Sequence, residues 1–447
     1  MKNKIKIFKN FLLSKNSDFI SYSISKVHST YSDYQKNENF YPMLTFLKKF
    51  FYFFDDNNSY PQKKKKTDIV IISNIVSLKN IKDDIYFGNL DKLLKKERIK
   101  VLTILRNHTS IRSKKIKSLL KKDSILLSKR LNYLNEILIL FNFLKEIFIF
   151  IFSKKYFPVK KYLNYFDLLS IISNLRLIHQ LDEILDIYKP KFVLFTYEGH
   201  AWERLLVFLC NKKNIKIKSI AYQFSTIKKN QIGLFTKLKE NYSPDYIATT
   251  GNIPFKIIKK KINFSKIIKL GSSKFVKIKK ITKKKIDLLV ALETDQKKLF
   301  EVINFCKNFA KKNSNFSIVL RPHPIITSKA RLIDKIKNIT IENQNIKISN
   351  NSLKTDLQNS KFLFYTESVL CITGLSYNVE PLFFKTKNVQ NIFDLKFPKN
   401  NIIKNYSDLK KKLTSKRNKK LSSYFVNYRK NYFEKYEIKK LKSLFRN

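Results

Sequence analysis

Short apolar runs alternate with helix-forming segments along most of this 447-residue chain, and this alternation restricts the possible folds more than any other feature. The apolar runs predict buried strands at 68–72, 101–105, 191–196, 215–222, 245–249, 266–270, 286–292, 316–320, 345–348 and 361–365. Helices are expected between them, as at 84–96, 296–312, 328–338 and 352–358. Strands separated by helices form parallel sheets, so we predict an α/β fold with two doubly wound sheets.

A lysine-rich segment at 277–285 shows no strong strand or helix pattern, and we expect it to link two domains. In the C-terminal part, Phe425, Tyr428, Tyr432 and Tyr436 have the spacing of one helical face. The predicted divisions are an N-terminal arm at 1–60, a first domain at 61–276 with a helical insertion at about 110–187, a second domain at 286–400 and a C-terminal helical segment at 401–447.

The formal net charge of +57 comes mainly from lysine: 11 of the 91 basic residues are arginine, which leaves 91 − 11 = 80 lysines. These lysines are scattered along the chain and do not gather in one tail or segment. A basic surface attracts acidic partners such as nucleotides and phospholipid headgroups, but the scatter argues against nucleic acid as the main partner. Cys210, Cys306 and Cys371 are far apart and odd in number, which predicts reduced thiols in a cytoplasmic protein.

The most apolar segment, 137–152, is interrupted by Asn142, Lys145 and Glu146. As a helix it would be roughly 24 Å long, shorter than the hydrocarbon core of about 30 Å. A buried core helix is the favoured interpretation. The alternative is an anchor in the membrane interface, for which lysines follow the segment at 154, 155, 160 and 161.

The first candidate site follows the predicted strand 191–196, in Thr196-Tyr197-Glu198-Gly199-His200-Ala201-Trp202-Glu203-Arg204. Glu198 precedes a predicted helix and is the first candidate for a general base, with His200 as the alternative. Glu203 is expected either to line a cleft or to complement the helix dipole. Gln223, which follows strand 215–222, is expected to line the same cleft.

The second candidate site combines two later strand ends. Strand 316–320 leads into Arg321-Pro322-His323-Pro324, and strand 361–365 leads into Thr366-Glu367-Ser368. Ligands of parallel sheets bind beyond the carboxyl ends of the strands, where a guanidinium, an imidazole and hydroxyls suit a nucleotide phosphate. The alternatives are a surface turn at Arg321 and His323, and a simple helix cap at Thr366 and Ser368.

These motifs together resemble GT-B glycosyltransferase-like proteins of bacterial surface-carbohydrate synthesis, with looser similarity to capsule Kdo transferases and CDP-glycerol glycerophosphotransferases. The resemblance covers about 65–400. It implies two Rossmann-like domains facing across a cleft, with the donor nucleotide held by the second domain and the acceptor by the first. It also implies transfer without a metal. The chain departs from the pattern at Ile372-Thr373-Gly374, where many such proteins have a ribose-binding glutamate; Glu380 comes later.

Our hypothesis is therefore a cytoplasmic glycosyltransferase, in possible peripheral contact with the anionic inner face of the membrane. Its partners would be a nucleotide sugar and a glycan or lipid-linked acceptor, and no cofactor or metal is expected. Arg321, His323, Thr366, Glu367 and Ser368 would bind the donor. The alternatives are a phosphoglycerol or other phosphoalcohol transferase with the same cleft, and a basic scaffold that binds acidic lipid or nucleic acid.

Overall fold

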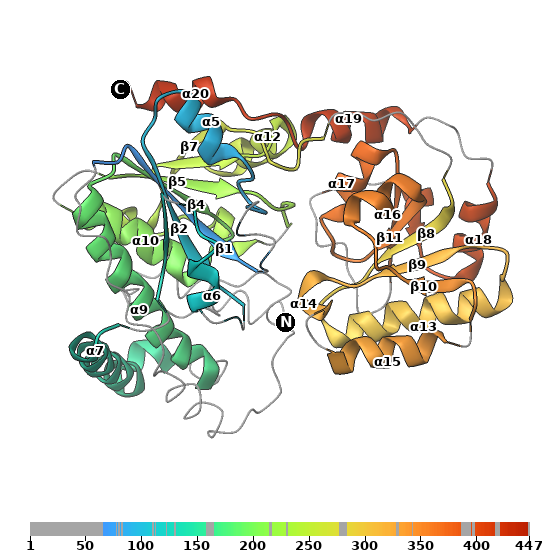
Figure 1. Ribbon diagram of the computed structural model, residues 1–447, viewed down its shortest axis with the longest axis horizontal. Coiled ribbons are helices and arrows are strands. Elements are labelled where there is room, and N and C mark those ends of the chain that lie inside the picture. The colour runs from blue at the N-terminus through green and yellow to red at the C-terminus, as the bar shows by residue number, and fades with distance from the viewer. Residues whose placement is uncertain are drawn as a thin grey trace. The chain divides into compact units, whose positions relative to one another are not determined.

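The computed structural model describes residues 66–445 except 77, 79–80, 82–83, 110, 112, 122, 129–130, 158–164, 214–216, 229–230, 277–283, 328–329, 342, 386–394, 396–397 and 416–420. The predicted N-terminal arm, 1–60, lies outside the described residues, as does most of the predicted linker. The described residues divide into two compact units (Figure 1). Unit 1 lies within Met1–Phe224, Asn230–Ser273 and Lys435–Asn447, and unit 2 within Ser225–Lys229 and Lys274–Glu434.

Unit 1 contains a seven-stranded parallel sheet in the order β3-β2-β1-β4-β5-β6-β7. Its strands are Ile69–Ile75 (β1), Val101–Asn107 (β2), Ser124–Leu126 (β3), Phe192–Thr196 (β4), Lys218–Gln223 (β5), Tyr246–Thr249 (β6) and Lys266–Lys269 (β7). Its helices are Leu90–Lys96 (α5), Ser113–Lys117 (α6), Tyr133–Phe152 (α7), Tyr165–Tyr188 (α9), Ala201–Lys212 (α10), Ile232–Phe235 (α11), Asn252–Lys261 (α12) and Ile438–Leu444 (α20), with short turns at Lys154–Tyr156 (η3) and Glu240–Tyr242 (η4).

Unit 2 contains a six-stranded parallel sheet in the order β10-β9-β8-β11-β12-β13. Its strands are Ile286–Ala291 (β8), Ile318–Arg321 (β9), Ile346–Ile348 (β10), Ser360–Tyr365 (β11), Glu380–Phe384 (β12) and Ile402–Ile403 (β13). Its helices are Gln296–Lys312 (α13), Pro324–Thr327 (α14), Ala330–Thr340 (α15), Leu353–Asn359 (α16), Leu370–Thr373 (α17), Tyr406–Thr414 (α18) and Ser423–Asn431 (α19), with short turns at Gly374–Tyr377 (η5) and Lys399–Asn401 (η6).

The central strands are buried on both faces, which explains why their sequences are continuously apolar. Ile69, Val70, Ile71 and Ile72 of β1 are at most 1% exposed. One face of the unit 1 sheet packs against α5 and α20, and α10 packs against β4 and β5 (Figure 1). In unit 2, α13, α15 and α18 share one apolar core with the sheet. The predicted α/β class with two doubly wound parallel sheets is confirmed.

Several elements differ from the predictions. The strands β3, β12 and β13 were not expected, and β3 lies inside the predicted helical insertion. The helix expected from 84 begins only at Leu90, because the Asp84 carboxylate accepts the backbone N–H groups of Tyr86 and Phe87 and closes a turn there. The aromatic stripe near the C-terminus is not one helix, since α19 ends at Asn431.

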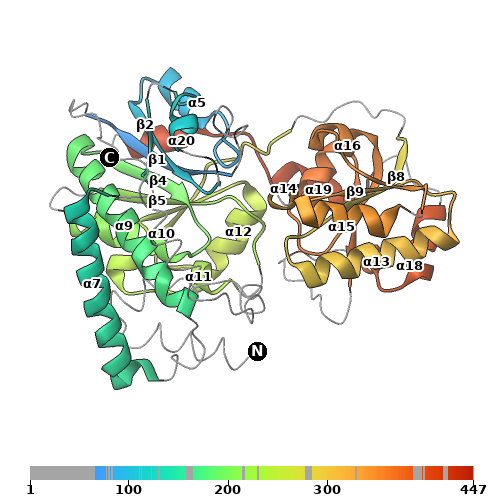
Figure 2. The same cartoon turned by 60° about the horizontal axis from the view of Figure 1, so that its bottom comes forward.

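Helix α7 is not a buried core helix, and this corrects the favoured interpretation of 137–152. Only Ile139 and Phe150 of this helix are buried, and Phe141 is 70% exposed. Figures 1 and 2 show α7 on the outside of unit 1, beside α9. Among the described residues, no helix is long and apolar enough to cross a membrane. The three cysteines are free and buried.

Candidate functional site

The strand orders identify one switch point in each sheet. In unit 1 the order reverses between β1 and β4, and in unit 2 between β8 and β11. Parallel sheets of this kind bind ligands beyond the carboxyl ends of the strands that flank the switch point. Glu198 and His200 follow β4, and Thr366, Glu367 and Ser368 follow β11. The sequence-predicted residues therefore lie at both switch points, which we describe as the unit 1 site and the unit 2 site.

The unit 1 site brings the two predicted base candidates together. Nε2 of His200 lies 3.4 Å from Oε2 of Glu198, and the side chains are 49% and 26% exposed. The chain turns sharply between them at Gly199, where φ is +87°, a backbone conformation that favours glycine. His200 then takes the N-cap position of α10. A carboxylate beside an accessible imidazole forms a pair that can accept a proton and stabilise the resulting imidazolium.

Glu203 has a supporting position in this site. Its Oε2 atom accepts the backbone N–H groups of Glu198, Gly199 and His200 at 2.9, 2.7 and 2.8 Å. The side chain is 1% exposed, and burial raises the pKa of Glu203 to about 7, although neighbouring His200 and the backbone donors lower it. Gln223 is also fully buried. Both residues that were predicted to line a cleft are therefore buried, and Glu203 stabilises the turn through its hydrogen bonds to the backbone.

A close contact between two glycines fixes the other side of this turn. A Cβ atom added to Gly233 would lie 2.5 Å from the Cα atom of Gly199, so a side chain at this position would clash with the backbone. The hydroxyl of Tyr197 donates to the carbonyl of Gly233 at 3.1 Å. The segment that contains α11 is therefore packed directly against the Glu198–His200 turn.

The structure adds Arg106 and His108 to the unit 1 site, and sequence reasoning missed both. The guanidinium carbon of Arg106 lies 4.4 Å from the ring centroid of Trp202, and burial lowers the pKa of Arg106 to about 10 while nearby Glu203 raises it. Nε2 of His108 lies 3.1 Å from Oδ1 of Asn74. Burial, together with the charges of Arg106 and His200, lowers the pKa of His108 to about 4. At neutral pH this edge therefore has a cationic guanidinium and a neutral imidazole. Both residues stand at the end of β2, so the strand-end rule that selected Arg321 would also have found them.

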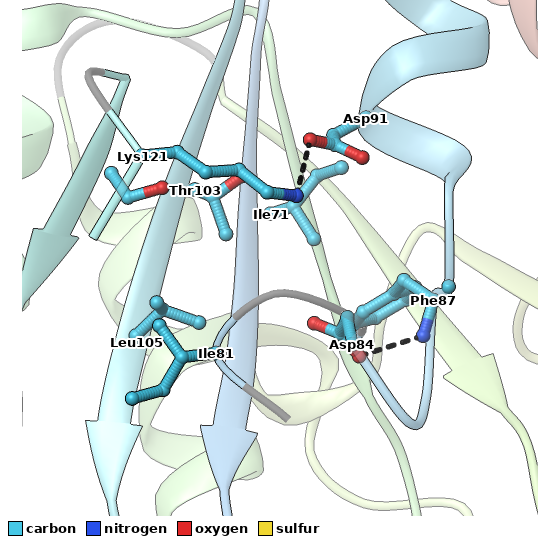
Figure 3. Close-up of a pocket in the computed structure, with 10 residues that line it drawn as sticks. Ile71, Ile81, Asp84, Phe87, Asp91, Thr103, Leu105 and Lys121 are labelled. Carbon is cyan, nitrogen blue, oxygen red and sulfur yellow. Dashed lines mark hydrogen bonds and ion pairs between the residues drawn. The ribbon is translucent and has the colours of Figure 1, made fainter. Parts of the chain in front are cut away.

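A small cavity with a mixed polar and apolar lining lies elsewhere in unit 1, beside α5 (Figure 3). It is lined in part by Asp84, Asp91, Thr103 and Lys121, and Figure 3 shows Lys121 paired with Asp91 across it, with a distance of 3.2 Å. The cavity volume is about 20 Å³, room for one water molecule. Burial raises the pKa of Asp84. The cavity is too small for a nucleotide or a sugar.

The unit 2 site joins the ends of β8 and β11. The backbone N–H of Glu367 donates to Oε1 of Glu293, which follows β8, at 3.2 Å. The Glu367 carboxylate pairs with the ammonium of Lys298, in the first turns of α13.

The hydroxyl of Thr366 is buried and has no hydrogen-bond partner within the described part of the chain. The Ser368 hydroxyl accepts the N–H of Leu370 at 3.4 Å, while Val369 takes the N-cap position of the following short helix.

Arg321 and His323 lie at the neighbouring strand end. Nη1 of Arg321 donates to Oδ2 of Asp356 at 2.5 Å and to the carbonyl of Asn351 at 3.1 Å. Asp356 is fully buried, so the guanidinium neutralises a buried carboxylate. His323 is half-buried, and its carbonyl accepts the N–H of Ile326 in α14. In the sheet β9 lies next to β8, so Arg321 and His323 are one strand away from the switch point.

Two further predictions concern Glu380 and the expected absence of a metal. Glu380 stands at the first position of β12, at the amino edge of the sheet, where it contacts Asn401 and Lys412. It is therefore at the opposite edge from the unit 2 site. In the described ranges, no three His, Cys, Asp or Glu side chains are grouped so that they could hold a metal ion.

No protein-family model matches the chain, and no curated protein matches it in sequence. Several solved structures are similar in fold. The UDP-GlcNAc 2-epimerase of Methanocaldococcus jannaschii, in complex with UDP-GlcNAc and UDP, is 13% identical over 85% of this chain and 100% of its own, with a TM-score of 0.51. S. aureus MnaA, in a structure with UDP, is 11% identical over 83% of this chain and 93% of its own, with a TM-score of 0.50. A putative UDP-N-acetylglucosamine 2-epimerase of Listeria monocytogenes is 9% identical over 82% and 91%, with a TM-score of 0.50.

At these identities the likeness concerns the fold. The chain has two Rossmann-like parallel-sheet units, the fold that the resemblance implied.

Proposed function

We propose that the protein is an enzyme that uses a nucleotide sugar, and specifically a glycosyltransferase that acts on a bacterial surface glycan or a lipid-linked acceptor. It would work in the cytoplasm, in peripheral contact with the membrane. The observation that supports this proposal most is the position of the polar segments. Each sheet has an independent set of polar side chains at its switch point, an acid–base pair in unit 1 and a hydroxyl-rich turn in unit 2.

In the proposed reaction, the unit 1 site receives the acceptor. The imidazole of His200 takes the proton of an acceptor hydroxyl, and the adjacent Glu198 carboxylate stabilises the imidazolium. The acceptor oxygen then forms a bond to the anomeric carbon of the donor. The bond between that carbon and the nucleotide phosphate breaks, and its electron pair remains on the phosphate oxygen. Glu203 is a positioning residue, because it holds the turn that places both groups.

The unit 2 site would hold the donor phosphate. The hydroxyls of Thr366 and Ser368, the imidazole of His323 and the guanidinium of Arg321 supply donors for an anion. Lys298 neutralises Glu367, so this carboxylate does not repel a phosphate nearby. Arg321 uses only its Nη1 atom for contacts with described residues, which leaves Nη2 and Nε for a ligand. The proposal requires no metal and no cofactor.

A second candidate function is epimerisation of a nucleotide sugar, which the fold likeness to UDP-GlcNAc 2-epimerases favours. In that case the acid–base groups of unit 1 would move a proton on a sugar carbon. The two functions require different substrates. Glycosyl transfer requires an acceptor, whose mass increases by that of the transferred sugar. Epimerisation proceeds without an acceptor and leaves the mass of the nucleotide sugar unchanged.

Nucleotide binding tests the proposal first. We expect one of UDP, CDP, CMP and GDP to raise the melting temperature selectively, and His323→Ala to reduce that shift. The matched control is His179→Ala, a partly exposed histidine on α9 that pairs with Glu183. If none of the nucleotides raises the melting temperature and the protein binds polyanions with affinity that falls steeply with salt, the basic scaffold replaces the enzyme. Mass spectrometry of the product then separates the added sugar of a glycosyltransferase from the added phosphoalcohol of the other transferase.

A further inference from the structure

The outward face of α7 is a continuous apolar surface. Its members recur every three or four residues, which places them on one side of a helix. Phe141, Phe148 and Phe152 are 70%, 63% and 69% exposed. We call this surface the α7 stripe; it consists of Leu134, Ile137, Phe141, Leu144, Phe148 and Phe152. Exposed apolar patches of this kind mark interaction sites.

The opposite face of α7 is fixed to unit 1, so the orientation of the stripe is defined. Ile139 and Phe150 are buried on that inner face. Arg176 of α9 donates through Nε and Nη2 to Oε2 of Glu136 at 2.8 and 2.7 Å. The side chain of Asn132 caps the first turn by accepting the N–H of Asn135. Figures 1 and 2 both show the helix along the outer side of unit 1.

The charges around the stripe indicate which partner covers it. Lys145 and Lys154 are exposed on and just after the helix. In the sequence, further basic residues flank the segment closely: Lys129, Arg130, Lys155, Lys160 and Lys161. The helix has two acidic residues, Glu136 and Glu146, and the ion pair with Arg176 offsets the charge of Glu136. A second copy of the chain would bring another net charge of +57 against this surface, whereas an anionic membrane has the opposite charge.

We propose that α7 is a membrane-docking helix, in which the α7 stripe enters the interface of an anionic phospholipid bilayer. The helix would lie in the plane of the membrane, with its apolar face at the boundary between headgroups and acyl chains and its lysines on the phosphates. Phenylalanine and leucine on one face and lysine at the margins are typical of such helices. This inference does not depend on the chemistry of the two candidate sites.

Co-sedimentation of the full chain with vesicles tests the proposal. We expect binding to vesicles that contain phosphatidylglycerol and much weaker binding to pure phosphatidylcholine. Phe141→Glu and Phe148→Glu should each lower the affinity about tenfold or more, since burial of one phenylalanine is worth at least that factor. The control is Ile341→Glu, which changes an 80% exposed residue of unit 2 and should leave binding unchanged. Equal binding of the wild type and both α7 variants would overturn the proposal, and so would absence of binding by the wild type.

A labelled variant gives an independent measurement in case the glutamate variants fold poorly. The three native cysteines are buried, so an environment-sensitive dye should label Phe148→Cys selectively in the folded protein. Its emission should shift to the blue when phosphatidylglycerol vesicles are added, and the same dye on Ile341→Cys should not shift. A blue shift that rises with protein concentration in the absence of vesicles would show that a second copy covers the stripe, and would overturn the lipid assignment. A dye already shielded in the monomer would show that another part of the chain covers it, with the same consequence.

Discussion

Replacement of Glu203 by alanine should destabilise unit 1 strongly, because one carboxylate oxygen satisfies three backbone donors. The N–H groups of Glu198, Gly199 and His200 all donate to Oε2 of Glu203 within 2.9 Å. Alanine leaves these groups without that acceptor in a turn that packs against α11. A buried donor left unpaired costs about 1 kcal/mol at the low end. The hydrogen bond of Gly199 is buried and the other two are partly buried, so we expect a loss of about 1–3 kcal/mol in the free energy of unfolding.

Urea unfolding followed by tryptophan fluorescence measures this loss in the right part of the molecule. Trp202 is the only tryptophan of the chain and precedes Glu203 directly, so its fluorescence reports on unit 1. The matched control is Glu183→Ala on α9, whose carboxylate is 41% exposed and pairs only with partly exposed His179 among the described residues. That change should cost less than about 0.5 kcal/mol. If Glu203→Ala costs no more than the control, Glu203 does not hold the turn and the positioning role is refuted.

Three further predictions concern the same unit. Burial raises the pKa of Glu203 from 4.5 in the unfolded chain to about 7 in the folded protein, so the folded protein binds a proton at this carboxyl group more tightly. The resulting gain in the free energy of unfolding is complete below about pH 4.5 and is lost as the pH rises through about 7. Between pH 5 and pH 8 the free energy of unfolding of the wild type should therefore fall by on the order of 2 kcal/mol more than that of Glu203→Gln. If urea unfolding gives the same pH dependence for the two proteins, the pKa of Glu203 is not raised. Gly233→Ala should lower the unfolding free energy by about 2 kcal/mol or more, because its Cβ would lie 2.5 Å from the Cα of Gly199; an unchanged urea midpoint would mean that the contact relaxes freely. Glu198→Gln and His200→Ala should keep the nucleotide-induced rise in melting temperature and lose turnover, and full turnover in both variants would remove the acid–base pair from the mechanism.

The sequence predicted the strands that are apolar on both faces, because burial on both faces leaves a continuous pattern. β1, β8 and β11 are of this kind. The missed strands lack the pattern for identifiable reasons. β12 begins with Glu380-Pro381, and proline disfavours a strand assignment. β3 and β13 contain only three and two residues, so their sequences give a weak strand signal.

Helix α7 shows a different limit of sequence reasoning. Its apolar composition predicts that its side chains are buried away from water, and either the protein core or an external partner could bury them. Whether a neighbouring element covers the helix depends on tertiary packing. In the structure, α9 covers only the side that contains Ile139 and Phe150. Composition alone could not divide the helix into an inner and an outer face.

The sequence predicted where the candidate residues of unit 1 lie, because the sheet topology determines their positions. The carboxyl ends of parallel strands meet at one edge, so the positions of Glu198 and His200 followed from the strand assignment. The function of Glu203 did not follow, because its three hydrogen bonds depend on the local path of the turn. A glutamate in the first turn of a helix is compatible with a dipole interaction, a cap or a cleft position, and backbone geometry selects among them.

Arg321 has a structural role that the sequence did not indicate. Its partner Asp356 lies 35 residues further along and is fully buried, so the pair is a structural requirement whether or not a ligand is present. Loss of the guanidinium would leave a buried carboxylate uncompensated, at a cost of about 3–5 kcal/mol. The same pairing engages Nη1 and so fixes the plane of the guanidinium group, whose side chain remains 22% exposed. If Arg321 binds the donor phosphate as proposed, a guanidinium held on one side by a buried carboxylate is already oriented for that phosphate on the other side, so less side-chain entropy is lost on binding.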